Sequence, residues 1–529
     1  MSWLDRLMGR SAPQVGASAS SGNAQETRWR GASRALRSLV NWRPVLGSAA
    51  TDMPANEQRT LRARSRDAMR SHTIARAAIM RPRTNIVGTG LMCRPQIDHK
   101  VLGLTPEEAE VINADVQRRY EAWAEDPVQC DAEATLDIYG QQGLTLMSAM
   151  LSGDVFVLTP QEDRGGTSTL KLQLIEADRV CNKDDAQNTE TLIDGIEIGA
   201  LGRPVACFIR STHPGDTTTA GIPTWTRYQF FGDATGRRRV LHIWNDKERP
   251  GQVRGAPFLA PILEPLKQLE RFGSAELMAA VMSAMLTFFI EQADPKFDPV
   301  TGSPLDGFAG MSGADPGTST APPTISVGEG AVVSLAPGEK PHMANPARPN
   351  ANFDPFFMSV VKSIGAALEL PVDELMLNYQ SSYSAARAAM LQAWRFYLLR
   401  RWALVQQFCA PVYGLWFDEE VASGRISAPG YSDPLRRKAW TRALWIGPAR
   451  GAMDEDKEAK AAKARIEAGV SNETIETMQL TGEDWQTVNA QRAREIASRK
   501  ANGTWVEPQQ AQRATASQPI PDPAQEEAA

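Results

Sequence analysis

The chain has 529 residues, enough for about three or four domains, and its 42% hydrophobic and 22% charged residues are typical of a globular protein. Its formal net charge of −5 argues against a dedicated nucleic-acid binder, which would carry a strong basic excess. The five cysteines are scattered and form no CxxC pair, which argues against a disulfide framework and indicates a reducing compartment. The N-terminal MSWLDRLMGRSAPQ has no apolar core of signal-peptide length, so we expect no export.

Residues 1–50 are rich in Ser, Ala, Gly and Arg, which predicts a flexible arm with short helical pieces. The next segment, 56–83, is helical in pattern and carries eight arginines. They could contact a phosphate backbone, or they could form salt bridges in an acidic protein, and we favour the salt bridges. These residues are Arg59, Arg62, Arg64, Arg66, Arg70, Arg76, Arg81 and Arg83.

Two more helices and a β-rich segment follow. TPEEAEVINADVQRRYEAW at 105–123 predicts a helix with Thr105 as its N-cap and Pro106 at the first helical position. Another helix is predicted over 136–151. After Gly153 the pattern changes to alternating β-branched and apolar residues between turn signals, which predicts a small β-rich domain. Its strands are expected in DVFVLTP, TLKLQLIEADRV, GIEIGALGRPVACFIRS, TRYQFF and RRRVLHIW.

The stretch AELMAAVMSAMLTFFI at 275–290 is nearly free of charge. Its uncharged run covers the 14 residues of 277–290, fewer than the ~20 that a helix needs to span a bilayer. Apolar residues at helical spacing lead into this run from Leu259 onward, so we predict one helix over 259–290, roughly 48 Å long. Such a helix should be kinked near Pro265 and buried against neighbours.

Residues 291–352 are dense in Pro and Gly and predict a loop-rich insertion with a hairpin in TISVGEGAVVSLAPGEK. A second helix follows, with Asp354 as its N-cap and Pro371 as its end. The polar VDELMLNYQSSYS connects it to a third helix that begins near residue 385 and is kinked at Pro411. One buried face of this third helix should consist of Leu391, Trp394, Leu398, Val405, Phe408, Val412 and Trp416.

The remaining sequence is polar. Residues 433–502 alternate in charge with helical spacing and are interrupted at Gly447 and Gly469. The last 25 or so residues have the composition of a disordered tail. Arg237, Arg238 and Arg239 lie at the start of a predicted strand, where they indicate a solvated edge.

Motifs for enzyme chemistry are missing. The chain has no GxxxxGK[ST] loop, and NIVGTGL at 85–91 contains only a GxG after a helix, which predicts a turn. SVVK at 359–362 lacks its SDN and KTG partner motifs, and GMSGA is not a nucleophile elbow. The five histidines form no HxxH or HxH pair. We therefore predict no catalytic residue, no metal and no cofactor.

The order of these parts resembles the lambda-type portal proteins of tailed bacteriophages. The resemblance extends from about Arg59 to Glu495, and its most specific stretches are RSRDAMRSHTIARAAIMRPRTNIVGTGL, SGDVFVL, LQLIEADRV, GIEIGALGRPVACFI, RGAPFLAPILEPLKQLERFGSAEL, LAPGEKP and SYSAARAAML. It implies an α+β, mainly helical fold with wing, stem, clip and crown regions that assembles as a ring. The implied regions are an N-terminal arm at 1–50, the wing at 51–255, the first stem helix at 256–290, the clip at 291–352, the second stem helix at 353–370, a tunnel loop at 371–384, the long wing helix at 385–432, the crown at 433–502 and a disordered tail at 503–529.

The resemblance also implies a function without catalysis. Twelve copies would form a dodecameric ring around a channel for double-stranded DNA, bound without sequence preference, at one capsid vertex of the virion. The expected partners are the terminase large subunit, a head–tail connector or adaptor, and the major capsid or scaffold protein, with assembly in the host cytoplasm and no membrane. Neighbouring stem helices would pack through Leu277, Met278, Val281, Met282, Met285, Leu286, Phe356, Phe357, Val360 and Ile364.

The polar, uncharged NYQSSYS falls where the family places its tunnel loop. Because a channel that passes DNA should avoid strong phosphate attraction, such a segment suits transient contact with DNA. Either it lines the constriction or it is a simple surface turn. The residues concerned are Asn378, Gln380, Ser381, Ser382 and Tyr383.

Two other classes of protein stay open at this point. A membrane-associated pore-forming protein could insert a helix at 275–290, and it would need detergent to stay soluble. A hydrolase with an unfamiliar site is the third possibility, and the missing motifs count against it.

Overall fold

The computed structural model describes residues 52–216, 222–284, 352–379, 382–451 and 454–505, two strands at 288–292 and 339–343, and a few positions between 37 and 50. Helices dominate these residues, and every strand pairing among them is antiparallel. The mainly helical α+β class predicted from the sequence is confirmed. The predicted arm at 1–50 and tail at 503–529 lie almost wholly outside the described residues.

The segment predicted as one helix at 56–83 forms two, α1 (Ala55–Ser71) and α2 (Thr73–Ile86), because His72 between them has an extended backbone. The other predicted helices of this region are confirmed. Thr105 caps α4 through a capping box, in which its side chain and that of Glu108 each accept a bond from the other's backbone N–H. The elements that follow α2 are β1 (Met92–Pro95), α3 (His99–Leu102), α4 (Pro106–Ala124), α5 (Pro127–Cys130) and α6 (Ile138–Ser152).

The predicted β-rich segment forms two sheets. In the first, the fully buried β2 (Asp154–Leu158) lies between β3 (Gln173–Ile175) and β8 (Val240–Trp244). The second has the order β4 (Leu192–Ile193), β5 (Ile196–Ile198), β6 (Pro204–Arg210) and β7 (Trp225–Gln229). Short 3₁₀ turns connect these strands at Ala177–Arg179, Lys183–Asp185 and Ala200–Gly202.

The single helix predicted over 259–290 is wrong at both ends. A 3₁₀ turn (Ala260–Ile262) leads into α7 (Leu263–Ala284), and the chain then forms β9 (Phe288–Gln292), which pairs with β10 (Glu339–Met343). Two adjacent aromatic residues followed by a β-branched one favour a strand at this point. The hairpin predicted inside 291–352 lies mostly outside the described residues.

The second predicted helix is α8 (Phe353–Ala367), followed by the short α9 (Val372–Met376). Its N-cap is Asn352, so Asp354 lies inside the first turn rather than at the predicted cap position. The third predicted helix is divided into α10 (Tyr383–Leu404), a π-helical turn (Val405–Cys409) and α11 (Ala410–Ala422).

The face predicted for the third helix is correct only after the π turn. Phe408, Val412 and Trp416 are buried as expected, but Leu391 and Leu398 are exposed. A π turn adds one residue to the helical repeat, so the buried positions before it are displaced by one residue. Ala393, Tyr397 and Leu404 are accordingly buried where Trp394, Leu398 and Val405 were expected.

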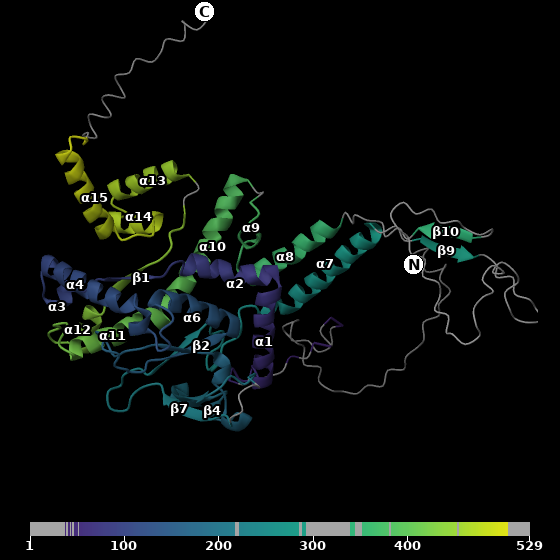
Figure 1. Cartoon of the computed structure of the whole chain (residues 1–529), viewed down its shortest axis with the longest axis horizontal. Helices are drawn as coiled ribbons and strands as arrows, with labels where there is room; N and C mark the ends of the chain where they lie inside the picture. The colour runs from purple at the N-terminus through teal and green to yellow at the C-terminus, as the bar shows by residue number, and fades with distance from the viewer. Residues whose placement is uncertain are drawn as a thin grey trace, which may run out of the picture.

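The C-terminal region contains α12 (Pro434–Trp440), β11 (Ala443–Ile446), α13 (Glu455–Glu467), α14 (Glu473–Leu480) and α15 (Trp485–Ala501). β11 pairs with β1, a contact that the sequence did not predict, and Trp440 is part of the main core. The first part of the predicted crown at 433–502 therefore belongs to the body, while α13, α14 and α15 form a separate group of helices (Figure 1).

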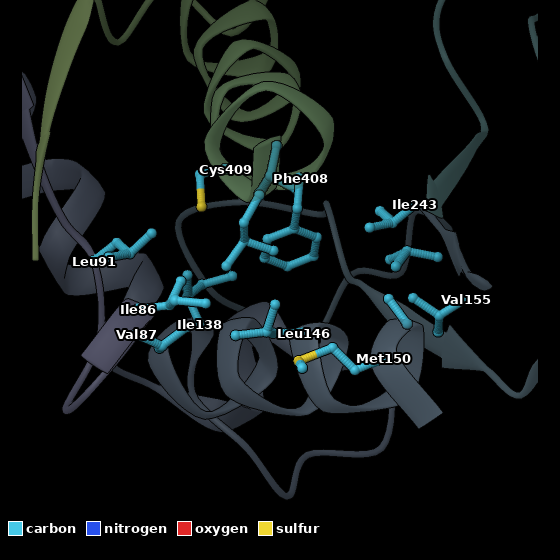
Figure 2. Packing of buried hydrophobic residues seen from close by; sticks show 14 of the residues in the cluster. Ile86, Val87, Leu91, Ile138, Leu146, Met150, Val155, Ile243, Phe408 and Cys409 are labelled. Atoms are coloured by element: carbon cyan, nitrogen blue, oxygen red, sulfur yellow. The ribbon is translucent and has the colours of Figure 1, made fainter. Parts of the chain in front are cut away.

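A main core holds the body together, and a second, smaller cluster of buried residues lies in the β-rich segment. Figure 2 shows Phe408 pointing from the π turn toward Leu146 and Met150 of α6, with Cys409 on the side of Leu91 and Ile86. Beside them lie Val155 of β2 and its cross-strand partner Ile243 of β8. All five cysteines are buried and unpaired, in agreement with the absence of a predicted disulfide framework.

Candidate assembly surface and channel loop

Two helices leave the body side by side. Figure 1 shows α7 and α8 extending away from the sheets, with β9 and β10 at their far end. Phe272 of α7 stacks on Phe353 at 5.3 Å between ring centroids and meets Phe356 edge-on at 4.9 Å. At the other end of the pair, Leu266 and Ile364 are buried in the main core. The pair is thus anchored at its base and held together by aromatic contacts above it.

The outer part of this pair carries apolar side chains that the described residues of the chain leave exposed. Leu277 is 68% exposed, Met278 62%, and Phe356 52%. We call these three, with the exposed Val281, the stem patch. Of the other residues predicted to face a neighbour, Ile364 is in the core, and Phe357 and Val360 pack partly against it. The side chain of Met282, together with Met285 and Leu286, lies outside the described residues.

The predicted tunnel loop at 371–384 contains the helix α9, and the part that follows, the α9–α10 loop, connects α9 to α10. It begins at Leu377, which has a left-handed φ of 52°, and continues through the exposed Asn378 and Tyr379. Ser382 caps α10 by accepting a hydrogen bond from the backbone N–H of Ala385 at 3.4 Å, and Tyr383 is the first helical residue. Gln380 and Ser381 lie outside the described residues. Whether these side chains line a channel stays a prediction.

A carboxylate holds the base of this loop. Glu374 of α9 accepts hydrogen bonds from the hydroxyls of Tyr379 in the loop, at 3.0 Å, and of Tyr397 in α10, at 3.2 Å. Asn85 of α2 donates a third, longer bond of 3.4 Å. Burial and the adjacent Glu374 carboxylate together raise the pKa of Tyr397, so that its hydroxyl stays protonated and donates. The Glu374 side chain thereby connects α9 to the loop, to α10 and to α2, and the sequence did not predict this connection.

A buried charge network lies where the stem pair begins. The carboxylate of Asp154, at the start of β2, accepts hydrogen bonds from Arg62 of α1 at 2.9 Å and from Nε of Arg254 at 2.8 Å. Nε2 of His242 and the backbone N–H of Gly255 also lie 3.1 Å from Asp154 Oδ2. Burial alone would raise the pKa of Asp154, but Arg254 and Arg62 lower it far below its usual range.

The sequence did not predict this network. Asp154 belongs to SGDVFVL and Arg254 to RGAPF, two of the stretches that carry the resemblance, but nothing in a single sequence shows that they meet. Arg254 also donates to the backbone carbonyls of Ala177, Val180 and Asp194, so it joins the turns of the β-rich segment to the start of the stem.

The arginines of α1 and α2 divide into two groups. Arg59, Arg62, Arg66 and Arg70 form ion pairs inside the chain, which confirms the salt-bridge interpretation for these four. Among the described residues, the others form no ion pair, and for them both interpretations stay open. The second group consists of Arg64, Arg76, Arg81 and Arg83.

The arginines of the predicted edge differ among themselves. Arg238 and Arg239 are exposed as expected, and Arg238 lies over the ring of Phe231 at 5.5 Å. Arg237 is partly buried, which lowers its pKa, and it faces Asp418 and Glu419. The prediction of a solvated edge is therefore wrong for Arg237.

One group of possible metal ligands occurs in the described part of the chain. Glu176, Asp178 and His213 bring a ligand atom each within 4.8 Å of one another. However, Arg66 already pairs with both carboxylates, at 3.0 and 2.9 Å. Nδ1 of His213 accepts a bond from the N–H of Gly215, which places the proton of the neutral ring on Nε2, the atom that faces Glu176. These contacts describe an ion-pair cluster.

The molecule thus combines an anchored helical pair that exposes apolar residues with a polar loop at the start of a long helix. Residues 36–401 match the model of the phage portal proteins, lambda family. The chain therefore belongs to the lambda family of phage portal proteins, which confirms the resemblance seen in the sequence.

Individual portal proteins are similar to this chain over most of its length. The portal protein of Escherichia phage N15 is 26% identical over 487 residues, which cover 88% of this chain and 89% of that protein. Portal protein B of Escherichia phage lambda is 25% identical and covers 88% of each chain. Among solved structures, a chain in the neck of a native GTA particle has a TM-score of 0.44 at 12% identity, over 79% of this chain and 93% of that one.

The membrane alternative is not supported. Residues 275–290 do not form one helix, because α7 ends at Ala284 and β9 begins at Phe288. In the part of the chain that the structure describes, none of the helices combines the length and the apolar character needed to cross a bilayer.

Proposed function

We propose that copies of this chain assemble into a ring that forms the DNA conduit at one vertex of a phage capsid. The observation that carries this proposal is the stem patch on a helical pair that leaves the body. Each fully buried Leu, Met, Phe or Val side chain would contribute about 1.5–3 kcal/mol, and in a single copy the four side chains of the stem patch are instead exposed.

A ring would result if neighbouring copies meet head to tail through these helices. Neighbouring copies related by rotation meet through two different faces, and such head-to-tail contacts close into a ring when the rotation angle permits. The α7–α8 pairs would then surround a central channel. By family membership we expect a dodecamer.

The α9–α10 loop is the segment that we place at the channel. Apart from the aliphatic Leu377, its described side chains are polar or aromatic, and none is charged, so they would touch DNA without binding phosphates strongly. Double-stranded DNA of any sequence could then move past Asn378, Ser382 and Tyr383, together with Gln380 and Ser381. The same conduit would serve genome packaging, head–tail joining and DNA ejection.

The chain has partners rather than a reaction of its own in this proposal. The end of the stem that carries β9 and β10 corresponds to the clip, where we place the terminase large subunit during packaging and the head–tail connector or adaptor afterwards. The ATPase activity would belong to the terminase, in keeping with the missing nucleotide loop. The body would contact the major capsid or scaffold protein, with assembly in the host cytoplasm and the finished ring in the virion.

The proposal is tested by electron microscopy and light scattering on the protein purified without detergent. We expect rings with a central hole and a mass near that of a dodecamer. A Leu277→Glu variant should fold, because Leu277 is exposed in the single chain, but should not form rings. Leu201→Glu is the matched control, since Leu201 is fully exposed on a turn of the second sheet. A wild-type monomer, or rings formed equally by Leu277→Glu, would contradict the proposal.

A further inference from the structure

The long helix α10 has a second apolar face that no part of the described chain covers. Trp402 is 63% exposed, Leu399 61%, Leu398 44%, and Leu391 36%. Their spacing of seven, eight and eleven residues from Leu391 places them on one side of the helix, and we call them the α10 stripe. Single exposed apolar residues are common on proteins, but four large ones on one helical face mark a contact surface.

The opposite face of α10 fixes the stripe in place. Ala393, Phe396 and Tyr397 are buried in the main core. Arg400 lies over the ring of Phe396 at 5.2 Å and donates to the backbone carbonyl of Asn245 at 2.6 Å. α10 therefore cannot turn to bury the stripe without breaking these contacts, so the stripe has to be covered from outside.

The charges near the stripe indicate what covers it. Arg387 pairs with Glu458, and Arg401 donates to the carbonyl of Ile86 at 3.0 Å, so both are already engaged. Arg395, which lies on the stripe's side of the helix between Leu391 and Leu398, is exposed and forms no ion pair with any residue that the structure describes. One free arginine among leucines and a tryptophan does not suit a phosphate backbone, whereas Trp and Arg are the residues most enriched at the centre of protein interfaces.

A second copy of the chain has the complementary chemistry. On the outer side of α4, Val111 is 72% exposed, and the exposed Glu107 lies one turn before it. Asp115, one turn after Val111, is already paired with Arg118 and Arg119. This side of α4 therefore offers an apolar contact beside the carboxylate of Glu107, which is what the stripe and Arg395 require. Figure 1 shows α4 and α10 in different parts of the body, so one chain cannot join them, and two copies in a head-to-tail arrangement can.

We propose that the α10 stripe is the surface through which the body of each copy packs against the body of the next copy. This inference rests on the proposed ring and specifies a contact in it that is separate from the stem patch. Trp402 and Leu398 form its apolar centre, and Arg395 pairs with a carboxylate of the neighbouring copy.

Thiol labelling tests this contact. Because all five native cysteines are buried, a cysteine introduced by Leu399→Cys would be the reactive thiol of the folded chain. Ala234→Cys, on an exposed turn between β7 and β8, is the matched control. In assembled rings we expect the Leu399→Cys thiol to react at least about tenfold more slowly than the Ala234→Cys thiol. In the Leu277→Glu background, which should be monomeric, the two thiols should react at similar rates.

A second pair of variants tests the contribution of the stripe to assembly. Leu398→Lys should lower the fraction of rings while leaving the thermal unfolding of the single chain unchanged, and Leu398→Met should assemble normally. Wild-type rings in which Leu399→Cys reacts as fast as the control would overturn this inference and leave the proposed function intact. A wild-type protein that stays monomeric would overturn both.

Discussion

Asp154 and Arg254 meet inside the molecule in a two-point contact, with Arg254 Nε 2.8 Å from Oδ2 and Nη2 3.2 Å from Oδ1 of the carboxylate. Asp154 begins the central strand of the first sheet, and Arg254 directly precedes the segment that leads into α7. Since both side chains are almost completely buried, this contact determines where the stem leaves the body. Arg62 attaches α1 to the same carboxylate.

Replacing Asp154 by Asn should destabilise the folded chain by about 3–5 kcal/mol, because two buried guanidinium groups lose their counter-charge. The new amide would also place donor hydrogens against those of its neighbours. The measurement is the free energy of unfolding from urea titration. Glu197→Gln is the matched control, since it breaks an ion pair of similar length, Glu197 with Arg227 at 2.8 Å, on the surface. That variant should lose at most about 1 kcal/mol, and equal losses in both variants would contradict the prediction.

The pH dependence of stability should follow the same carboxylate. Its pKa in the folded state lies far below the value of about 3.9 expected in the unfolded chain. The contribution of Asp154 to the free energy of unfolding is therefore complete above about pH 5. It is lost as the pH falls below about 4, because the carboxyl group is then protonated in the unfolded state before it is protonated in the folded state. Between about pH 4 and pH 2 the wild type should lose up to about 1.4 kcal/mol per pH unit more than Asp154→Asn. Parallel curves for the two proteins would contradict this assignment.

Periodicity predicted most of the elements, and the failures have physical causes. The cap at Thr105 was found because its signal is local, involving only residues 105–108. The buried face of α10 was missed because the π turn at Val405–Cys409 changes the helical repeat, and no residue type announces such a turn.

The site was predicted less completely than the fold. Leu277, Met278 and Phe356 were proposed as contact residues from the family resemblance, and the structure leaves all three exposed. The contacts of Asp154 with Arg254 and of Glu374 with Tyr397 join residues far apart in the sequence, and one chain without homologues gives no signal for such pairs.

Gly153 and Gly255 approach each other so closely that neither position can take a side chain. A Cβ on Gly255 would lie 2.0 Å from the carbonyl oxygen of Gly153, and one on Gly153 would lie 2.2 Å from that of Gly255. Gly255→Ala should therefore cost about 1–3 kcal/mol of unfolding free energy, since backbone must move to make room. Gly273→Ala is the control, because a Cβ there meets nothing within 4 Å in the interior of α7. It should stabilise the chain by about 0.5–1 kcal/mol, and a similar effect of both changes would contradict the close approach.

The hydroxyl of Tyr379 should limit the motion of the α9–α10 loop, because its bond to Glu374 at 3.0 Å connects the loop to α9. Tyr379→Phe removes a bond worth about 0.5–1.5 kcal/mol, so hydrogen exchange at residues 377–383 should become roughly three- to tenfold faster. Tyr228→Phe on β7 is the control, since the Tyr228 hydroxyl makes no hydrogen bond to the residues that the structure describes. Unchanged exchange in Tyr379→Phe would show that Glu374 does not hold the loop.

The loop itself should be needed for handling DNA but not for forming the ring. Deleting 378–383 removes none of the stem patch and none of the buried face of α10, so rings should still assemble. Capsids built with such rings should package or retain less DNA, because the proposed constriction would be gone. A second variant that replaces 378–382 by Gly and Ser at constant length keeps the connection between α9 and α10 and tests the side chains alone. The measurement is the amount of nuclease-protected DNA per capsid, and normal amounts with both variants would contradict a role of this loop in the channel.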